Sequence, residues 1–326
     1  MSETKSKPLS MDDLVQEVLR TYGREALSFT ELASGYANIN YKVETTTGPV
    51  LLRLCRQQPE PLLRYEVLLM KRLRQLSFPT AYPIARLDGD YITRAGGENL
   101  MLYDFIPGQE PEVNASTAGE IGQAVGILST LQPEPVLQKT NAVHINNCHQ
   151  LIAEFSQAAN RYPDIFSYFK EQTAYLEPLL EKPLPTGIIH GDVFPNNTLF
   201  EGNRLLAIID FEEACTDHLL MDVGMSMNGF CFVNNQLDMV LAEHFLAAYT
   251  RHRPLQEEEW ALLPVYLQWG AHGMLSWHLR NNLLYHEKPQ QLARVRELME
   301  RTITLRKSEE IILNNLATLA RHQAWN

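Results

Sequence analysis

The sequence has 326 residues, which is enough for one large domain or two lobes with a substantial buried core. Hydrophobic residues make up 45% and charged residues 21% of the chain, a composition typical of folded globular proteins that excludes a disordered polymer. The formal net charge of −11 argues against a broad surface for nucleic acid or anionic membrane, so we expect neither partner.

The four cysteines lie far apart and form no Cys-x-x-Cys pair, so we expect reduced, mostly buried thiols rather than a zinc site. The first ten residues are polar and do not resemble a signal peptide. No apolar run approaches the roughly 20 residues that cross a membrane. The sequence therefore predicts a cytoplasmic protein.

The first hundred residues predict a small sheet accompanied by helices. Apolar residues recur at helical spacing over 11–22, and Gly23 follows them, which indicates a short amphipathic helix. The β-rich runs within 27–55 predict three antiparallel strands, and a second helix is expected over 62–76. Further strands are predicted at 84–87, 91–93 and 100–105, with turns at Asp88-Gly89 and Gly96-Gly97.

From Ser116 onward, helical periodicity dominates. It is interrupted over 187–211, which predicts a strand, a polar loop, a second strand, a turn and a third strand. We place a hinge near Pro107, which divides a β-rich lobe (1–106) from a larger helical lobe (107–326). This pattern predicts an α+β protein of two lobes, and the cleft between such lobes is a preferred ligand site.

The segment 187–211 carries the strongest chemical signal. One apolar strand delivers His190, Gly191 and Asp192 into a loop, Asn197 follows five residues after the aspartate, and a later apolar strand ends at Asp210. One acid can accept the proton of an attacking hydroxyl, and two oxygen ligands can hold magnesium on a nucleotide. A single Asp or Asn is more often a turn residue, but this combination favours phosphoryl transfer.

Two motifs in this segment, HGDVFPNN and IIDFEEA, resemble the catalytic and metal-binding loops of the aminoglycoside phosphotransferase and choline kinase superfamily. The runs SGYANINYKVETTTGPVLLRL, MLYDFIPGQ and IIDFEEACTDHLLMDVGMSMNGFC are similar in order and spacing to bacterial homoserine kinases of that fold. The resemblance covers about residues 28–300. It implies a protein-kinase-like bilobal fold, with a small antiparallel N-lobe containing one helix and a mainly helical C-lobe. It also implies ATP and Mg²⁺ and a small hydroxyl acceptor, above all homoserine.

The resemblance assigns roles to the residues of this motif. It makes Asp192 the catalytic base and makes Asn197 and Asp210 the magnesium ligands. His190 is expected to brace the loop, and we also count it among the candidates for substrate contact. Asp222 opens an apolar helix and is either its N-terminal cap or a buried acid that supports the catalytic loop.

In the first lobe, the resemblance indicates contacts to the nucleotide. Ser34 and Asn38 lie on a strand-turn-strand segment expected to cover the phosphates, although the segment has a single glycine. Arg53 stands where kinases of this fold usually carry a phosphate-binding lysine. Glu66 is its candidate partner, with a lone surface glutamate as the alternative. On the connecting strand, where backbone groups would pair with adenine, the candidates are Tyr103 and Phe105; an ordinary buried strand would look the same.

The acceptor is less sharply defined. Glu212 and Glu213 follow the metal aspartate and can bind an amine, support the magnesium site or remain surface charge. Gly273 and His278 stand where the resemblance places carboxylate-binding arginines, so Arg280 is the candidate substitute.

Several readings of the acceptor and the activity therefore remain. Choline, ethanolamine and hydroxylysine stay open as acceptors, and an aminoglycoside is less suited because its charges need a larger acidic surface. A non-catalytic nucleotide-binding protein is the competing class, against which the intact Asp192, Asn197 and Asp210 argue. We expect a monomer or a homodimer whose partner is a small molecule.

Overall fold

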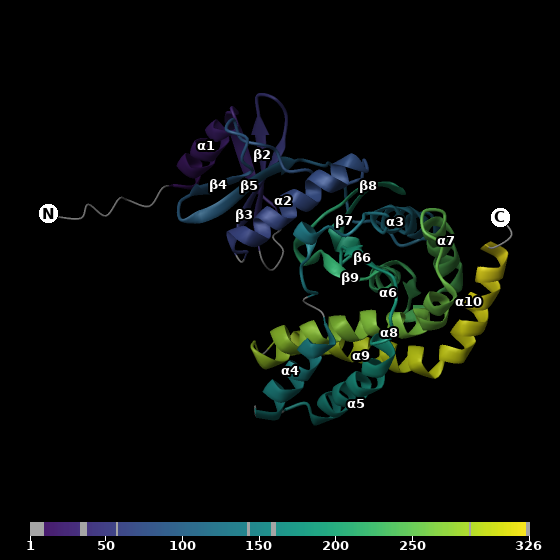
Figure 1. Cartoon of the computed structure of the whole chain (residues 1–326). Helices are drawn as coiled ribbons and strands as arrows, with labels where there is room; N and C mark the ends of the chain where they lie inside the picture. The colour runs from purple at the N-terminus through teal and green to yellow at the C-terminus, as the bar shows by residue number, and fades with distance from the viewer. Residues whose placement is uncertain are drawn as a thin grey trace. The chain divides into compact units, whose positions relative to one another are not determined.

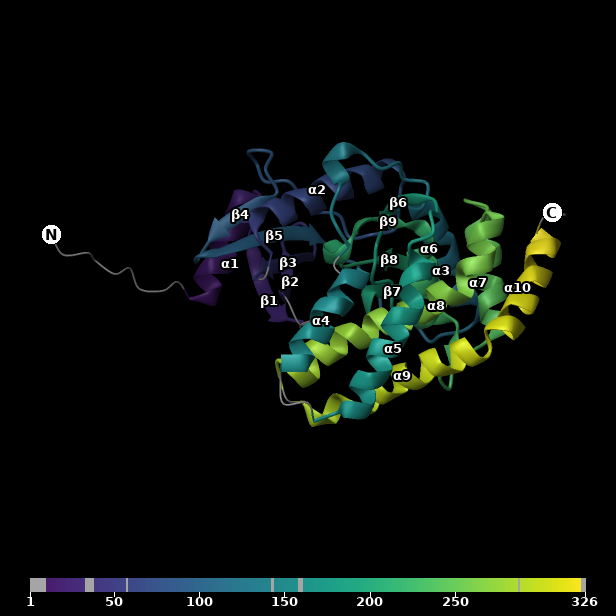
Figure 2. The same cartoon turned by 60° about the horizontal axis from the view of Figure 1, so that its bottom comes forward.

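The computed structural model describes residues 10–32, 38–56, 58–141, 144–157, 161–286 and 288–323 (Figure 1, and turned in Figure 2). The chain divides into two compact units, Met1–Pro107 and Gly108–Asn326, which we describe separately. The predicted α+β class, with an antiparallel sheet early in the chain and a mainly helical remainder, is confirmed. The roles expected of the two lobes stay predictions.

The described residues of the first unit form an antiparallel sheet of five strands in the order β1-β2-β3-β5-β4, with helices on both faces. The strands are β1 (Ala26–Glu31), β2 (Ile39–Thr45), β3 (Val50–Cys55), β4 (Ile92–Ala95) and β5 (Glu98–Asp104). The helices are α1 (Met11–Thr21) and α2 (Glu60–Gln75). Both helices and these strands lie within a few residues of their predicted positions.

Alternation of side chains along the strands gives this sheet two faces. Leu52 and Leu54 of β3 lie in one apolar cluster with the buried side of α1. Cys55 lies on the opposite face, in a cluster with Leu63 of α2. Because successive residues of a strand point to opposite faces, Arg53 shares the α2 face with Cys55.

The prediction of a strand at 84–87 is wrong. A single isolated bridge joins Pro83 to Tyr103, and the residues that follow form a loop. The loop closes on itself, because Arg86 N donates to Asp90 O and Gly89 N donates to Arg86 O. The predicted turn at Gly89 is present, and its φ of +87° is one that glycine adopts at little cost.

Within the described residues, the second unit is built on helices, with three short pairs of strands. The helices are α3 (Ala115–Leu128), α4 (Ile145–Gln157), α5 (Pro163–Leu180), α6 (Leu219–Phe230), α7 (Met239–Thr250), α8 (Glu257–His278), α9 (Leu292–Lys307) and α10 (Glu309–Gln323). Three antiparallel pairs accompany them: β6 (Thr186–Ile189) with β9 (Cys215–His218), β7 (Thr198–Glu201) with β8 (Arg204–Ile208), and β10 (Phe232–Val233) with β11 (Gln236–Leu237). The strands after Asp210 were not predicted.

Helices α6 and α8 form the packed centre of this unit and contact each other closely (Figures 1 and 2). A Cβ atom on Gly224 of α6 would lie 2.3 Å from the carbonyl oxygen of Tyr266 of α8, so this approach requires glycine. The four cysteines are buried and form no disulfide bond among the described residues, as predicted. Within the described residues, we find no helix with the length and apolarity of a membrane span.

Candidate active site

The candidate catalytic loop leaves the end of β6. This strand pairs with β9, where Ile189 lies opposite Cys215. Gly191 has a φ of +80°, a conformation that favours glycine and turns the chain directly before Asp192. A short 3-10 turn (Pro195–Asn197) then leads into β7. The strand end therefore places Asp192 on a tight, constrained loop.

Asn197 holds Asp192 in place. Its Nδ2 donates to the main-chain oxygen of Asp192 at 2.9 Å and to the carboxylate Oδ2 at 2.7 Å. Asn197 is buried, with 6% of its surface exposed. Because Nδ2 is bonded to the aspartate, the Oδ1 atom of Asn197, which also accepts from Asn196 Nδ2 at 3.2 Å, is the end of the side chain that can bind a cation.

The β7–β8 hairpin brings Asp210 to the same place. Thr198 lies opposite Ile208, and Ile209 N donates to Asn197 O at 2.9 Å, so the residue after Ile209 lies beside Asn197. Asp210 has a φ of +67°, which is uncommon outside glycine and often marks a functional position. Its Oδ1 atom is buried and has no hydrogen-bond partner among the described residues.

These atoms fit a divalent cation. A buried carboxylate oxygen without a donor costs free energy, and a cation would satisfy it. Magnesium is commonly held by one or two protein oxygen ligands together with substrate phosphates rather than by an all-protein cage. Asn197 Oδ1 and the Asp210 carboxylate form such a pair; no cluster of three or more His, Cys, Asp or Glu side chains able to hold a metal occurs in the described part of the chain.

The electrostatics of Asp192 suit a group that accepts a proton. Burial raises the pKa of Asp192 to about 7, and the negative charges of Asp210, Glu213 and Asp222 act in the same direction. The hydrogen bond from Asn197 works against this rise in pKa. A base functions best when its pKa lies near the working pH.

Asp222 accepts two backbone hydrogen bonds from the candidate catalytic loop. Its Oδ2 accepts from His190 N at 2.6 Å and its Oδ1 accepts from Gly191 N at 2.7 Å. The side chain lies in the first turn of α6, whose N-cap is His218, and it is 2% exposed. Burial raises its pKa to about 6, and the two N–H donors oppose that rise. Asp222 was predicted to be either a helix cap or a buried acid that supports the loop. These contacts favour the buried acid, because His218 is the N-cap of α6.

The substrate contact considered for His190 is corrected by the structure. His190 is fully buried, its Nε2 donates to Ile209 O at 3.0 Å, and its Nδ1 accepts from Asp192 N at 3.2 Å. Burial lowers its pKa to about 4, so the ring is neutral at pH 7. Nε2 therefore joins the candidate catalytic loop to the segment before Asp210, Nδ1 bonds within the loop, and neither nitrogen is left for a substrate.

In the first unit, Arg53 and Glu66 form a buried ion pair. Arg53 Nη1 lies 3.3 Å from Glu66 Oε1, and the two side chains are 9% and 4% exposed. The alternative of a lone surface glutamate is therefore wrong. The Tyr103 hydroxyl donates to the same Glu66 oxygen at 2.8 Å, and the guanidinium of Arg53 lies 4.8 Å from the centre of the Tyr103 ring.

These contacts correct the adenine contact expected of Tyr103. Its side chain is 3% exposed and bonded to Glu66. The neighbouring backbone is also used, because Ile84 N donates to Leu102 O at 2.7 Å and Asp104 N donates to Tyr82 O at 3.0 Å. Tyr103 thus presents neither its side chain nor the adjacent backbone groups to a nucleotide.

The remaining nucleotide candidates keep their predicted roles. Asn38 is buried directly before β2. Phe105 follows β5, and the ammonium of Lys42 lies 4.9 Å from the centre of its ring. Ser34 lies outside the described residues. Contact of these side chains with a nucleotide stays a prediction.

The residues after Asp210 include a contact that the sequence did not reveal. Glu212 and Glu213 lie in a 3-10 turn (Phe211–Glu213), and the exposed Glu213 lies near enough to Asp192 to influence its pKa. The ammonium of Lys139 donates to the main-chain oxygen of Glu212. A single lysine in a loop follows no pattern, so this contact could not be recognised from the sequence.

Arg280 lies in a π-helical segment (Leu279–Leu284) that continues α8. Its Nη2 donates to Asn147 O at 3.4 Å, and its Nε lies 3.7 Å from Glu154 Oε2, both on α4. Within the described ranges, these partners do not include the catalytic loop. Substrate binding by Arg280 therefore stays a prediction.

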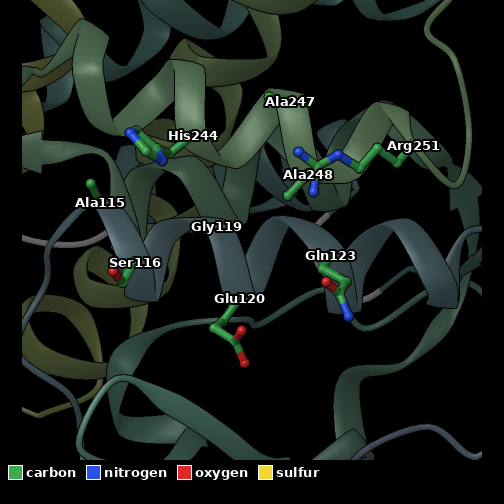
Figure 3. A pocket seen from close by; sticks show the side chains of 9 residues that line it. All are labelled: Ala115, Ser116, Gly119, Glu120, Gln123, His244, Ala247, Ala248 and Arg251. Atoms are coloured by element: carbon green, nitrogen blue, oxygen red, sulfur yellow. The ribbon is translucent and has the colours of Figure 1, made fainter.

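A separate cavity of about 290 Å³ lies between α3 and α7 (Figure 3). Glu120 and Gln123 project from α3, and His244 and Arg251 project from α7. None of the predicted site residues lines it; the lining consists of Ala115, Ser116, Gly119, Glu120, Gln123, His244, Ala247, Ala248 and Arg251. We assign it no part in the reaction.

The chain matches the model of a known protein family over most of its length. The model of the phosphotransferase enzyme family matches residues 28–255, which include all three. The chain belongs to the phosphotransferase enzyme family.

Relatives of this phosphotransferase include the homoserine kinase of Afipia carboxidovorans, which is 30% identical over 251 residues, 76% of this chain and 77% of that protein. A microcompartment-associated aminopropanol kinase has a similar structure, with a TM-score of 0.72, 16% identity and coverage of 91% of this chain and 97% of that chain. An amicoumacin kinase solved with AMP-PNP and Ca²⁺ has a TM-score of 0.71 and 14% identity, and covers 90% of this chain and 93% of its own.

At these identities, the two structures establish the fold alone. Together with the family match, they confirm the predicted resemblance and the protein-kinase-like fold. The family match and the homoserine kinase relative also confirm the predicted enzyme class, a small-molecule kinase with ATP as co-substrate.

Proposed function

We propose that this phosphotransferase is a homoserine kinase, which transfers the terminal phosphoryl group of ATP to the side-chain hydroxyl of homoserine. The observation that carries phosphoryl transfer is the meeting of Asp192, Asn197 and Asp210 at the ends of β6 and of the β7–β8 hairpin. Homoserine as the acceptor is supported by relatives named homoserine kinase, one of which aligns over 76% of this chain.

In the proposed reaction, Asp192 acts on the acceptor. Asn197 Nδ2 holds one carboxylate oxygen of Asp192, and we assign the other oxygen, Oδ1, to the acceptor hydroxyl. The hydroxyl oxygen forms a bond to the γ-phosphorus, the bond from that phosphorus to the bridging oxygen of ADP breaks, and Asp192 takes the hydroxyl proton. Positioning of the hydroxyl provides much of the rate enhancement in such a step.

We assign Asn197 Oδ1 and the Asp210 carboxylate to Mg²⁺. The buried Asp210 Oδ1, which has no donor among the described residues, supports this assignment. When bound, the ion neutralises charge on the phosphates of the nucleotide. The two residues are positioned by the chain itself, through the bond from Ile209 N to Asn197 O.

We assign Arg53 to the nucleotide phosphates and Glu212 with Glu213 to the ammonium group of the acceptor. A guanidinium has five donors in a planar fork, so Arg53 can keep its bond to Glu66 and still bind phosphate oxygens. Glu213 is exposed next to the catalytic loop, where it can meet a cationic substrate group. We further propose a cytoplasmic enzyme that acts as a monomer or homodimer, without nucleic acid or membrane partners.

One observation favours a second candidate, the kinase of a small amino alcohol that has no carboxylate, such as ethanolamine or choline. Arg280, the cation considered for the substrate carboxylate, contacts Asn147 and Glu154 of α4. An acceptor that lacks a carboxylate would not need it.

The test is ADP release by the purified protein with MgATP and a panel of acceptors, with homoserine first, then ethanolamine, choline and hydroxylysine. We expect homoserine to have the highest kcat/KM. If homoserine is inert and another acceptor reacts, the substrate assignment is wrong while phosphoryl transfer stands.

The role of Asp192 is tested with the Asp192→Asn variant. A positioned base contributes about 10²- to 10⁴-fold, so kcat should fall by that factor while binding of MgATP is retained. The acceptor and nucleotide are titrated separately to show that both still bind. Wild-type turnover in this variant would remove Asp192 from the mechanism.

A further inference from the structure

Arg53, Glu66 and Tyr103 form a buried group within the first unit. In the β3–β5 ladder, Arg53 lies opposite Met101 and Leu51 lies opposite Tyr103, so Arg53 and Tyr103 are diagonal neighbours on the same face of the sheet. Helix α2 packs on this face and brings Glu66 to both of them. All three residues are buried, with 7%, 3% and 3% of their whole surface exposed in that order.

Each member of the group restrains another. Glu66 Oε1 accepts two bonds, from Arg53 Nη1 at 3.3 Å and from the Tyr103 hydroxyl at 2.8 Å. Burial raises the pKa of Tyr103 well above its usual value, so the hydroxyl keeps its proton and remains a donor. Glu66 is therefore held from two directions, and the guanidinium that it binds also lies against the Tyr103 ring.

The contact between Arg53 and the Tyr103 ring depends on the planar guanidinium of an arginine. A guanidinium is planar and stacks on an aromatic face, whereas an ammonium is a compact point charge with rotating donors. A guanidinium held by Glu66 at one nitrogen and by the Tyr103 ring, whose centre lies 4.8 Å away, has a restricted orientation for its other donors. Tyr103 thus contacts the guanidinium of Arg53 through its ring, and it contacts Glu66, the ion-pair partner of Arg53, through its hydroxyl.

We propose that Tyr103 is a positioning residue that orients Arg53 for the phosphates of the nucleotide, through its ring and through its hydroxyl on Glu66. This inference rests on the proposed function, in which Arg53 binds those phosphates. It replaces the direct adenine contact that the sequence suggested for Tyr103. It also explains how arginine can serve at a position where kinases of this fold usually carry lysine.

The experiment compares two substitutions that separate the hydroxyl from the ring. Tyr103→Phe keeps the ring and removes the donor, and we expect the KM for ATP to rise about fivefold. Tyr103→Leu removes both, and we expect a rise of about 30-fold. In each variant, kcat at saturating ATP should stay within about twofold of wild type, because the catalytic loop is untouched. The Kd for MgATP, measured by titration, should follow the KM.

Tyr22→Phe is the matched control. Tyr22 is also a buried tyrosine of the first unit, at 6% exposure, and its hydroxyl donates to Tyr91 O at 3.0 Å. It belongs to the cluster on the α1 face of the sheet, away from Arg53. We expect this variant to lose stability as Tyr103→Phe does, without a change in the KM for ATP.

A double substitution tests whether Tyr103 acts through Arg53. In an Arg53→Met background, Tyr103→Phe should produce no further rise in the KM for ATP, because residues of one network are not additive. If Tyr103→Phe raises the KM equally in both backgrounds, Tyr103 acts independently of Arg53 and the inference is wrong.

The two possible failures are distinguishable. If Arg53→Met leaves the KM and Kd for ATP unchanged, the phosphate role of Arg53 in the proposed function fails, and this inference fails with it. If Arg53→Met raises both while Tyr103→Phe and Tyr103→Leu match wild type, only the positioning role of Tyr103 is overturned. Because Tyr103→Phe preserves the ring and the packing, it keeps the test valid even if Tyr103→Leu does not fold.

Discussion

Replacement of His272 by phenylalanine should change how the stability of this phosphotransferase depends on pH. His272 lies on α8 and is fully buried. Its Nε2 donates to Thr173 Oγ1 at 2.9 Å, since that hydroxyl donates in turn to Phe169 O, and its ring stacks on Phe169 with centroids 4.5 Å apart. Its Nδ1 has no hydrogen-bond partner among the described residues.

The size of the expected change in stability follows from the pKa of His272. Burial lowers the pKa of His272 to about 3, against about 6.5 in an unfolded chain. Between these values, the unfolded state binds more protons than the folded state, so stability falls as the pH falls below 6.5. At about 1.4 kcal/mol per unit, the free energy of unfolding should lose about 2 kcal/mol between pH 7 and pH 5 through this one residue.

His272→Phe removes this contribution and keeps an aromatic ring against Phe169. The variant loses a hydrogen bond to Thr173, worth about 1 kcal/mol, but also removes the unpaired Nδ1. We therefore expect a free energy of unfolding within about 1 kcal/mol of wild type at pH 7. The loss between pH 7 and pH 5 should be smaller than in wild type by about 2 kcal/mol.

The assay is urea unfolding at pH 7, 6 and 5, followed by circular dichroism. Thr173→Val is the matched control, because it removes the same hydrogen bond without removing a titrating group. It should lower the free energy of unfolding by a similar amount at all three pH values. If wild type and His272→Phe lose the same free energy of unfolding between pH 7 and pH 5, the prediction is refuted. Burial of neutral His272 would then not be the source of that pH dependence.

Three further predictions concern the candidate site. Asp210→Asn should raise the Mg²⁺ concentration needed for half-maximal activity at least tenfold, because it weakens a carboxylate ligand; an unchanged Mg²⁺ titration would contradict the metal assignment. Asp222→Ala leaves two backbone N–H groups without an acceptor, so kcat should fall at least tenfold while the Kd for MgATP is retained. Wild-type kcat there would show that the loop does not depend on Asp222. Lys139→Met removes one donor to Glu212 O and should lower kcat by about fivefold or less, measured at saturating substrates; a loss confined to the KM for ATP would argue against this contact.

Most helices and the strands of the first sheet could be predicted because their signals are local. The helix of α1 shows apolar residues at helical spacing, and β3 shows an apolar run bounded by turns. The strand expected at 84–87 failed because its residues bond within a loop closed at Gly89. Strands β10 and β11 have two residues each, which is too few for alternation to appear in the sequence.

The candidate site shows the same division. The order of Asp192, Asn197 and Asp210 was visible in the sequence, because Asp192 and Asp210 each come after an apolar run and Asn197 lies in the polar loop between those runs. Their meeting depends on one hairpin, in which Thr198 pairs with Ile208. A short hairpin brings nearby residues together whatever the rest of the fold does.

The sequence by itself determined most elements of the first sheet, the mainly helical character of the second unit, and the order of the candidate catalytic and metal-binding residues. Only the tertiary structure decided that Asp222 supports the loop, that Tyr103 binds Glu66 and that Lys139 reaches Glu212. These pairs are separated by 32, 37 and 73 residues. The physical reason is that contacts between distant residues depend on which faces of two elements pack together and in what register, and local periodicity carries no record of that choice.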